Sequence, residues 1–375
     1  MRAIYSPAVF DGEHEHAEAV VLIDGDRIVG LAAEAPPGCE LEELPEGAIL
    51  APGFIDLQVN GGGGVLLNHR IDVAAMTAMA AAHARAGSTT IMPTVISGTR
   101  PELHAALQAA REALAQAVPG VGGLHLEGPF LAPTRRGIHP ASHITAPDAA
   151  DIEMLTAKFP GPLLLTVAPD VVSSAMIRQL VNSGAVVFAG HTDADYETVL
   201  AGFDAGISGF THLFSAMSQV MPRAPGAVGA ALVDPRPFAG IIVDGLHVHP
   251  AAIRLAFNAM GPDRLFLVSD AMATAASDLE RFMLYDVEIT LHDGKLTDAA
   301  GTLAGAHLTM AEAVANMVHL VGCTRHDALR MATATPADVA GFADRGRIAP
   351  GLRADLVALN RKLEVIDVWQ GGMRL

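Results

Sequence analysis

The sequence has very little cysteine and a deficit of positive charge. Only two cysteines, Cys39 and Cys323, occur in 375 residues, and neither belongs to a CxxC or Cys/His cluster. A disulfide framework and a thiolate metal site are therefore excluded, and we expect a reducing, cytoplasmic location. Lys and Arg number 24 against 41 Asp and Glu. The net charge of −17 disfavours nucleic-acid binding, because that affinity comes from neutralising phosphates with Lys and Arg.

Long apolar runs are also lacking. No stretch reaches about 18 residues without charged or turn residues, the length a membrane-spanning helix needs. The N-terminal stretch MRAIYSPAVFDG lacks the basic start and apolar core of a signal peptide. We therefore expect neither export nor a membrane span. Hydrophobic residues nevertheless make up 51% of the chain, which supplies a large core, and its length favours one large domain with a smaller one.

Short apolar segments alternate with amphipathic helical segments over most of the chain. Helical patterns such as DVAAMTAMAAAHARAG and DADYETVLAGFDAG separate several of these segments. Apolar strands that alternate with helices are typical of a parallel sheet covered on both faces, and eight such strands close a barrel. The sequence therefore predicts an α/β fold, a (β/α)8 TIM-like barrel. Its strand candidates are GFIDLQV, STTIMPTV, VGGLHLEG, PLLLTVAP, AVVFAG, ISGFTHL, FAGIIVDG and RLFLVSD.

The two ends of the chain have a different pattern. Residues 1–50 alternate short β-like stretches with Gly, Pro and acidic turns, and RGRIAPGLRADLVALN and VIDVWQGGMRL near the C-terminus again read as strands. We predict a small β-sandwich domain formed by residues 1–50 and 345–375, and a barrel formed by residues 51–344.

Polar side chains stand where the predicted barrel strands end. Carboxyl ends of barrel strands converge on one mouth, where active sites lie. A glutamate with two histidines suits zinc, and an unligated aspartate beside them can handle the proton of an activated water. The residues in chain order are Gln58, Asn60, Glu127, His191, His212, His247 and Asp270.

Each of these residues also has an ordinary structural explanation. A histidine after a buried strand is often a hydrogen-bonded packing residue, and an acidic residue there is often a helix cap. Four coincidences at one mouth favour a functional site. The run Gly61–Gly64 resembles a phosphate cradle but lacks the Lys and Ser/Thr of a P-loop, so a loop beside the site is favoured. Histidines without such placement are read as surface or packing residues: His69, His83, His104 and His125.

A set of motifs distributed along the chain resembles the N-acetylglucosamine-6-phosphate deacetylase family of the amidohydrolase superfamily. The motifs occur in one order over most of the sequence, and together they are far more specific than any one alone. They are PGFIDLQVNGGGG, HLEGPFL, GHTDADY, THLFSAM, PRAPG, DGLHVHP, LVSDAM and GTLAGAHLTM.

The resemblance implies a reaction and its residues. Glu127, His191 and His212 would bind the catalytic metal and leave one position open for water. Asp270 would be general base and then general acid, and His139 would contact the sugar and the acetyl carbonyl. The reaction implied is hydrolysis of the acetamide of N-acetylglucosamine 6-phosphate by a metal-activated water, which yields acetate and glucosamine 6-phosphate.

The end of the first strand sets the expected metal count. Many amidohydrolases have HxH there, whereas this chain has Gln58-Val59-Asn60, which are poor zinc ligands. We therefore expect one divalent metal per subunit, zinc as the first choice and ferrous iron as the second. The resemblance also counts Gln58 among the substrate-binding residues.

The resemblance assigns the 6-phosphate to a second group of residues. Arg223 and His247 would hold it, together with Ser215 and Ala216. Ser215 replaces the Asn of the family, so we expect it to keep a backbone contact and to lose a side-chain contact. Arg223, together with His247, would cross into the site of a neighbouring subunit, which makes a homodimer or a dimer-based oligomer the expected assembly.

Two other functions remain open. One is an amidohydrolase with a different substrate, such as N-acetylgalactosamine 6-phosphate or a cyclic amide. The other is a barrel that binds amino-sugar phosphates without catalysis.

Overall fold

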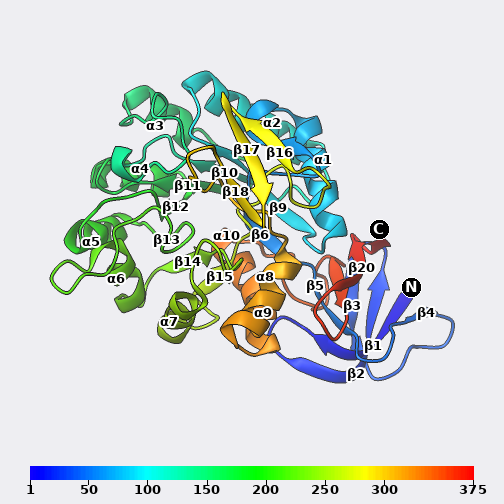
Figure 1. The fold of residues 1–375 in the computed structure, drawn as a ribbon. Helices are drawn as coiled ribbons and strands as arrows, with labels where there is room; N and C mark the ends of the chain where they lie inside the picture. Colours follow the sequence, from blue (N-terminus) through cyan, green and yellow to red (C-terminus); the bar gives the residue numbers. More distant parts are fainter.

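The structure, a computed structural model that describes residues 1–375, places a barrel of eight parallel strands beside a second sheet formed by the two ends of the chain (Figure 1). The barrel strands follow one another around the ring in chain order. A parallel bridge between Val59 and Ala271 joins the first strand to the segment after the last and closes the ring. The predicted TIM-like barrel is confirmed. Its strands are β6 (Ile55–Val59), β9 (Thr90–Ile96), β10 (Leu124–Glu127), β11 (Leu163–Val167), β12 (Val186–Ala189), β13 (Gly209–Phe210), β14 (Phe238–Ile241) and β15 (Leu265–Leu267).

Helices cover the outside of the barrel, and their polar first residues explain where several of them begin. The side chains of Asp72, Ser173 and Asp195 each accept a hydrogen bond from a backbone N–H of the first turn. Between helices and strands lies a core of 83 buried residues. The helices are α1 (Val73–Arg85), α2 (Arg100–Ala115), α3 (Ala149–Thr156), α4 (Ser174–Asn182), α5 (Tyr196–Ala205), α6 (Gly226–Val233), α7 (Pro250–Met260), α8 (Met310–Asn316), α9 (Arg325–Ala332) and α10 (Ala334–Ala340), with single turns η1 (Leu67–His69), η2 (Pro133–Arg135) and η3 (Met317–Val321).

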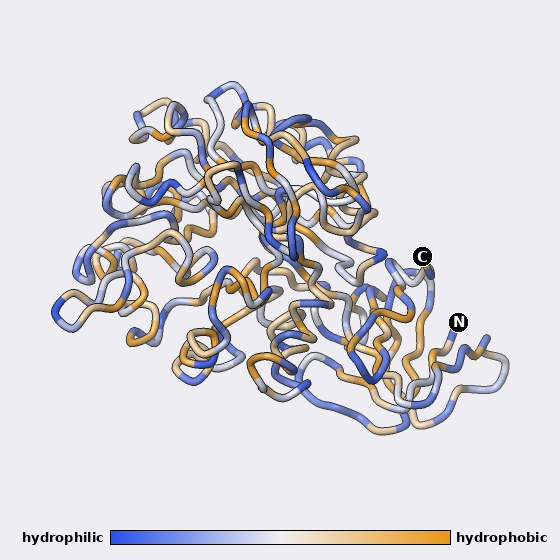
Figure 2. Tube along the Cα trace, viewed as in Figure 1, coloured by the Kyte–Doolittle hydropathy of each residue, from blue (hydrophilic) through white to orange (hydrophobic).

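The distribution of hydropathy follows this layering. The trace is largely hydrophobic along the central strands, and hydrophilic residues gather in the outer turns (Figure 2). Every residue of β9, β10 and β11 is buried, because helices lie outside these strands and side chains fill the barrel inside. No helix is long and apolar enough to cross a membrane.

The second sheet joins the two ends of the chain. β19 pairs antiparallel with β5, with Val357 opposite Ala51, and so ties the C-terminal strands to the N-terminal ones. A separate core of 14 buried residues, which includes Trp369, stabilises this sheet. The domain boundaries at residues 50 and 345 stay a prediction. The eight connected strands are β1 (Arg2–Phe10), β2 (Glu15–Asp24), β3 (Arg27–Ala32), β4 (Glu40–Glu43), β5 (Ile49–Pro52), β19 (Leu356–Leu359), β20 (Val365–Gln370) and β21 (Met373–Arg374).

A three-stranded antiparallel sheet, absent from the sequence prediction, lies at the barrel mouth (Figure 1, yellow). It consists of β16 (Arg281–Leu284), β17 (Val287–His292) and β18 (Lys295–Thr297). Its apolar face packs with Ile96, at the end of β9, and Met272, which follows β15. A short hairpin of β7 (Gly61–Gly62) and β8 (Val65–Leu66) lies at the same end.

Trp369 provides a test of how much the C-terminal strands stabilise the second sheet. Its side chain is 1% exposed and pairs across the sheet with Leu356. We expect Trp369→Ala to lower the free energy of unfolding by about 3–5 kcal/mol, because a large buried side chain is lost. Urea unfolding followed by circular dichroism measures this change. Ile366→Ala, at a 36% exposed position of the same strand, is the control and should change stability by less than about 0.5 kcal/mol. Equal effects would contradict the prediction.

Candidate functional site

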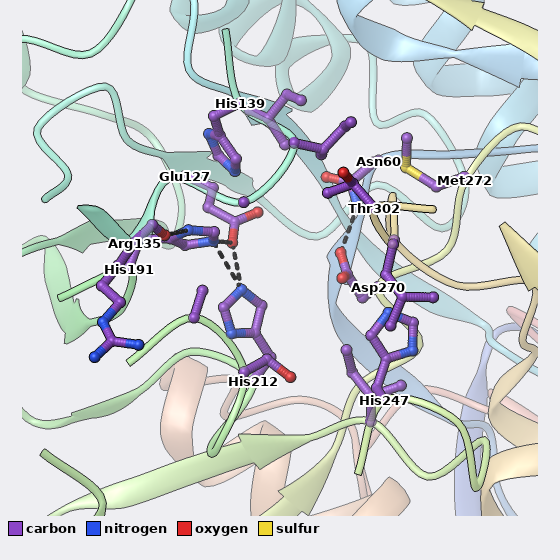
Figure 3. A pocket seen from close by; sticks show the side chains of 18 of the residues that line it. Asn60, Glu127, Arg135, His139, His191, His212, His247, Asp270, Met272 and Thr302 are labelled. Atoms are coloured by element: carbon purple, nitrogen blue, oxygen red, sulfur yellow. Dashed lines mark hydrogen bonds and ion pairs between the residues drawn. The ribbon is translucent and has the colours of Figure 1, made fainter. Parts of the chain in front are cut away.

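A pocket of about 520 Å³ opens at the carboxyl ends of the barrel strands. This volume suits a small metabolite. Side chains from six of the eight strand ends line it, as the sequence predicts, and they point toward one another in Figure 3. They are Asn60, Glu127, His191, His212, His247 and Asp270.

Glu127 forms the centre of a tight group with two histidines. It is the last residue of β10 and only 2% exposed. Its Oε1 lies 3.1 Å from Nε2 of His191 and 2.8 Å from Nε2 of His212, and the two Nε2 atoms are 3.1 Å apart. Three atoms that can ligate a metal therefore converge on one point.

The hydrogen bond on the far side of the His191 ring indicates that a cation belongs between the three ligand atoms. Nδ1 of His191 lies 2.8 Å from the backbone carbonyl oxygen of Arg135, which can only accept, so Nδ1 carries a hydrogen. In the neutral ring Nε2 then presents a lone pair to the carboxylate oxygen of Glu127. Two lone pairs at 3.1 Å repel each other unless a cation lies between them. The donor set therefore fits a divalent metal, and its Glu-His-His composition suits zinc or ferrous iron.

The pKa shifts of this group have the same cause. Burial alone would raise the pKa of the Glu127 carboxyl, but the close contacts of its Oε1 with the His191 and His212 rings outweigh burial and hold that pKa well below its ordinary value. Burial would lower the pKa of His212, but the Glu127 carboxylate raises it. Both shifts indicate a place where positive charge is stabilised.

His139 offers an alternative set of ligands, which its hydrogen bonding excludes. Glu127, His139 and His191 place one ligand atom each within 4.8 Å of one another, a looser arrangement than the triangle with His212. The backbone N–H of Ser97 donates to Nδ1 of His139 at 3.3 Å, and burial lowers the pKa of His139 to about 3. The ring is therefore neutral with its hydrogen on Nε2, which leaves no lone pair for a metal. His139 is instead a hydrogen-bond donor to the pocket.

Asp270 lies beside the triangle and is held by two amides. Nδ2 of Asn60 donates to its Oδ1 at 2.6 Å, and Nε2 of Gln58 donates to the same oxygen at 3.1 Å. Oδ2 makes no hydrogen bond within the chain, so it is free to exchange a proton. Burial, with the charge of Glu127 as a second cause, raises the pKa of Asp270 to about 6. A carboxyl with this pKa can take up and return a proton near neutral pH.

Gln58 supports the carboxylates and does not line the pocket. Nε2 of Gln58 also donates to Oε2 of Glu127 at 3.1 Å, and the side chain is 2% exposed. With both carboxylates as neighbours, the amide must turn its NH₂ group toward them. The expected role of Gln58 in substrate binding stays a prediction, and both of its N–H donors are already used inside the protein.

The residues expected to hold phosphate divide into two groups. Ser215, Ala216 and His247 line the pocket, and Nδ1 of His247 is fixed 2.6 Å from Oδ2 of Asp244. Arg223 is exposed and lies outside the pocket lining of its own chain.

One cation of the pocket, Arg135, was not predicted from the sequence. Arg135 is the only Lys or Arg in the lining, and its Nε donates to Oδ1 of Asp193 at 2.8 Å. The adjacent arginines of RRGIHP were the available signal, but nothing in the sequence shows which of them faces the pocket.

The glycine run is not a phosphate cradle. The N–H groups of Gly61, Gly63 and Gly64 donate to backbone carbonyls of residues 271, 275 and 273 at 2.8–2.9 Å. These donors are therefore used to attach the β7–β8 hairpin to the segment that follows the last strand, in agreement with the reading as a loop beside the site.

Several site residues have strained backbones. His191, His212 and Asp270 have φ angles of +46°, +31° and +50°, in the left-handed region that non-glycine residues rarely adopt. Such conformations cost about 1–3 kcal/mol each and cluster at functional sites. No sequence pattern predicted these backbone conformations.

Comparison with known proteins gives this geometry a context. The sequence model of the amidohydrolase family matches residues 49–374 of this chain. The chain is 40% identical over 329 residues to an N-acetylgalactosamine-6-phosphate deacetylase of Shewanella sp. (strain ANA-3), which covers 88% of this chain and 83% of the relative. It is 33% identical over 358 residues to an N-acetylglucosamine-6-phosphate deacetylase of Haemophilus influenzae, which covers 94% and 93%. The crystal structure of N-acetylglucosamine-6-phosphate deacetylase from Pasteurella multocida superposes with a TM-score of 0.96 at 33% identity, over 100% of this chain and 99% of that one.

Metal content distinguishes the two possible ligand sets. We expect His212→Asn to be purified without bound metal and His139→Asn to retain its metal. Of these two histidines, only His212 can offer a lone pair to a metal between Glu127 and His191. Elemental analysis of both variants and the parent protein measures this. The opposite pattern would assign the metal to Glu127, His139 and His191.

Proposed function

The chain belongs to the amidohydrolase family, and on that premise we propose that it hydrolyses the acetamide of an N-acetylhexosamine 6-phosphate to acetate and the free amine. One observation carries this proposal: the triangle of Glu127, His191 and His212 stands beside Asp270 in a pocket of metabolite size. The near full-length match to deacetylases of this kind supports it.

Glu127, His191 and His212 would hold one divalent metal, with zinc as the first choice and ferrous iron as the second. A metal bound there supplies Lewis acidity, which lowers the pKa of water and polarises a carbonyl group. A second metal is disfavoured because the amides of Gln58 and Asn60 already occupy the carboxylate oxygens that it would need. Two metals per chain, both needed for activity, would contradict this assignment.

The remaining steps fall to side chains of the pocket. Asp270 accepts the proton of the attacking water through its free Oδ2. His139 donates its Nε2 hydrogen to the acetyl carbonyl oxygen, where negative charge develops as the water adds. Asp270 then delivers the proton to the amine nitrogen as the C–N bond breaks. A carboxyl with a pKa of about 6 can perform both transfers.

The sugar is the finer part of the proposal. We assign N-acetylglucosamine 6-phosphate as the first substrate, supported by the full-length likeness to the Pasteurella multocida enzyme. N-acetylgalactosamine 6-phosphate, which differs only in the orientation of the 4-hydroxyl, is the second candidate. The 40% identity to the Shewanella deacetylase favours it.

Acetate release from both epimers tests the proposal directly. We expect the metal-loaded protein to release acetate from one or both sugar phosphates. Asp270→Asn should keep its metal and lose roughly 10²-fold to 10⁴-fold in kcat, because the amide cannot take the proton. Enzymatic determination of acetate, with metal content measured in parallel, provides the data. Near-native turnover in this variant would make Asp270 a structural residue, and no release from either epimer would refute the function.

Arg223 suggests a dimeric functional unit. It lies in a tight turn in which Met221 and Ala224 exchange backbone hydrogen bonds, next to Val220 and Met221, which are 53% and 60% exposed. An exposed turn with apolar neighbours suits a subunit contact. A guanidinium offers phosphate a bidentate partner, which a chain of net charge −17 needs at its pocket. We propose that Arg223 reaches the neighbour's site in a homodimer.

We further propose a cytoplasmic location, which the low cysteine content supports. Cys39 and Cys323 are both free, and neither has a partner for a disulfide.

Subunit mixing tests the position of Arg223. We expect Arg223→Met to raise KM for the phosphorylated sugar strongly and to leave the slow hydrolysis of the unphosphorylated sugar nearly unchanged. Mixing it with Asp270→Asn should restore part of the activity, because one site of a mixed dimer has both residues intact. Arg178→Met, which removes the same charge from an exposed position on α4, is the control. No restoration despite proven subunit exchange would place Arg223 in its own subunit's site.

A further inference from the structure

His139 is held on its far side by a single residue, Ser97. Ser97 follows directly after β9, and it is completely buried. Its backbone N–H donates to Nδ1 of His139 at 3.3 Å, and its Oγ lies 2.8 Å from the same nitrogen. A backbone N–H can only donate, so Nδ1 accepts and the hydroxyl is its second donor. The pocket-facing Nε2 must then carry the ring hydrogen.

The space for the Ser97 hydroxyl comes from Gly128 in the HLEGPFL motif. A Cβ on Gly128 would lie 2.4 Å from Oγ of Ser97, and the φ of +83° at Gly128 also favours glycine. The strand end that carries Glu127 is thus shaped to accommodate this hydroxyl.

The backbone carbonyl of Ser97 is fixed from another part of the chain. The hydroxyl of Tyr285 donates to it at 2.9 Å, and Nδ1 of His143 lies 3.1 Å from it. Nδ2 of Asn68 donates to the Tyr285 hydroxyl at 2.9 Å. Hydrogen bonds therefore hold the Ser97 peptide in one orientation.

Tyr285 stands at the tip of the hairpin between β16 and β17, where Leu284 pairs with Val287. Its φ is +51°, a left-handed conformation that is unfavourable for a bulky aromatic residue. A two-residue hairpin turn imposes a positive φ at its first position, and a bulky aromatic residue is an unusual occupant of that position. The three-stranded sheet thus has a specific connection to the pocket.

We propose that Ser97 is a positioning residue that fixes His139 as the Nε2–H tautomer, and that Tyr285 holds Ser97 in the orientation this requires. The inference rests on the proposed deacetylase function, in which the Nε2 hydrogen faces the acetyl carbonyl oxygen. In the other tautomer a lone pair would face that oxygen and repel it. The hydrogen bond from Nε2–H of His139 strengthens as the acetyl carbonyl oxygen becomes anionic in the transition state. Loss of this hydrogen bond therefore lowers kcat more than it changes KM.

Nitrogen NMR of the zinc-loaded protein with ¹⁵N-labelled histidine tests the tautomer directly. Long-range ¹H–¹⁵N spectra show which ring nitrogen carries the hydrogen, and loss of signals in His139→Gln identifies the ring. We expect Nε2–H in the parent protein and a partial shift toward the other tautomer in Ser97→Ala, because that variant loses the 2.8 Å hydroxyl contact and keeps only the longer backbone N–H bond at 3.3 Å to hold Nδ1 as the acceptor. Unchanged His139 signals in Ser97→Ala would overturn the proposal. This readout needs no activity, so it stands apart from a failure of the deacetylase assignment.

Kinetics complete the test. We expect Ser97→Ala to lower kcat for acetate release roughly 10-fold to 100-fold, as for other residues that orient a functional histidine, with KM changed less than about twofold. Tyr285→Phe, which removes one neutral hydrogen bond and leaves Ser97 in place, should lower kcat about fivefold.

Ser88→Ala is the matched control. Ser88 is also buried, but its hydroxyl has no hydrogen-bond partner. This variant should keep the parent kcat and the parent His139 spectrum. Equal losses in Ser88→Ala and Ser97→Ala, or a normal kcat in Ser97→Ala, would show that Ser97 only fills space.

Discussion

A buried carboxylate stays ionised only where positive charge or hydrogen-bond donors surround it. Glu127 meets this requirement differently on its two oxygens, and the rest of the pocket is arranged around that difference. Oε1 faces the ring nitrogens of His191 and His212, whereas Oε2 receives the amide of Gln58. The first oxygen needs a cation, and the second is already satisfied. This asymmetry separates the metal side of the pocket from Asp270 and gives the two carboxylates different tasks.

The barrel and most strand-end residues could be predicted because their causes are local. Strands such as TIMPTVI are mostly apolar and buried along their whole length, since both of their faces are covered. The regular alternation of strand and helix then indicates where each strand ends. The sheet of β16–β18 escaped prediction because its strands are short and largely exposed. Only a few apolar residues, such as Leu284 and Ile289, pack against the barrel mouth. That contact spans distant parts of the chain and leaves no periodic signal.

Roles inside the site depended on hydrogen-bond direction, which sequence does not contain. His139 and His212 are both buried histidines near Glu127, and either could complete a ligand set. The backbone N–H of Ser97 decides between them, because it uses the only lone pair of His139. Gln58 likewise stands where a ligand or substrate contact was expected, yet its amide supports two carboxylates. Backbone strain at His191 and Asp270 was equally invisible, since it arises from the way the loops leave the strands.

The junction at which the first and last strands close the barrel lies within the site. The backbone N–H of Asp270 donates to the carbonyl of Gln58, and that of Asn60 donates to the carbonyl of Ala271. These partners are separated by more than 200 residues, so they meet only after every intervening strand has taken its place. A growing polypeptide that still lacks its eighth strand has neither the aspartate nor the neighbour that aligns the two amides. The carboxylate of Asp270 and the two amides that hold it therefore come together only when the eighth strand is in place, and a chain without that strand has an incomplete pocket.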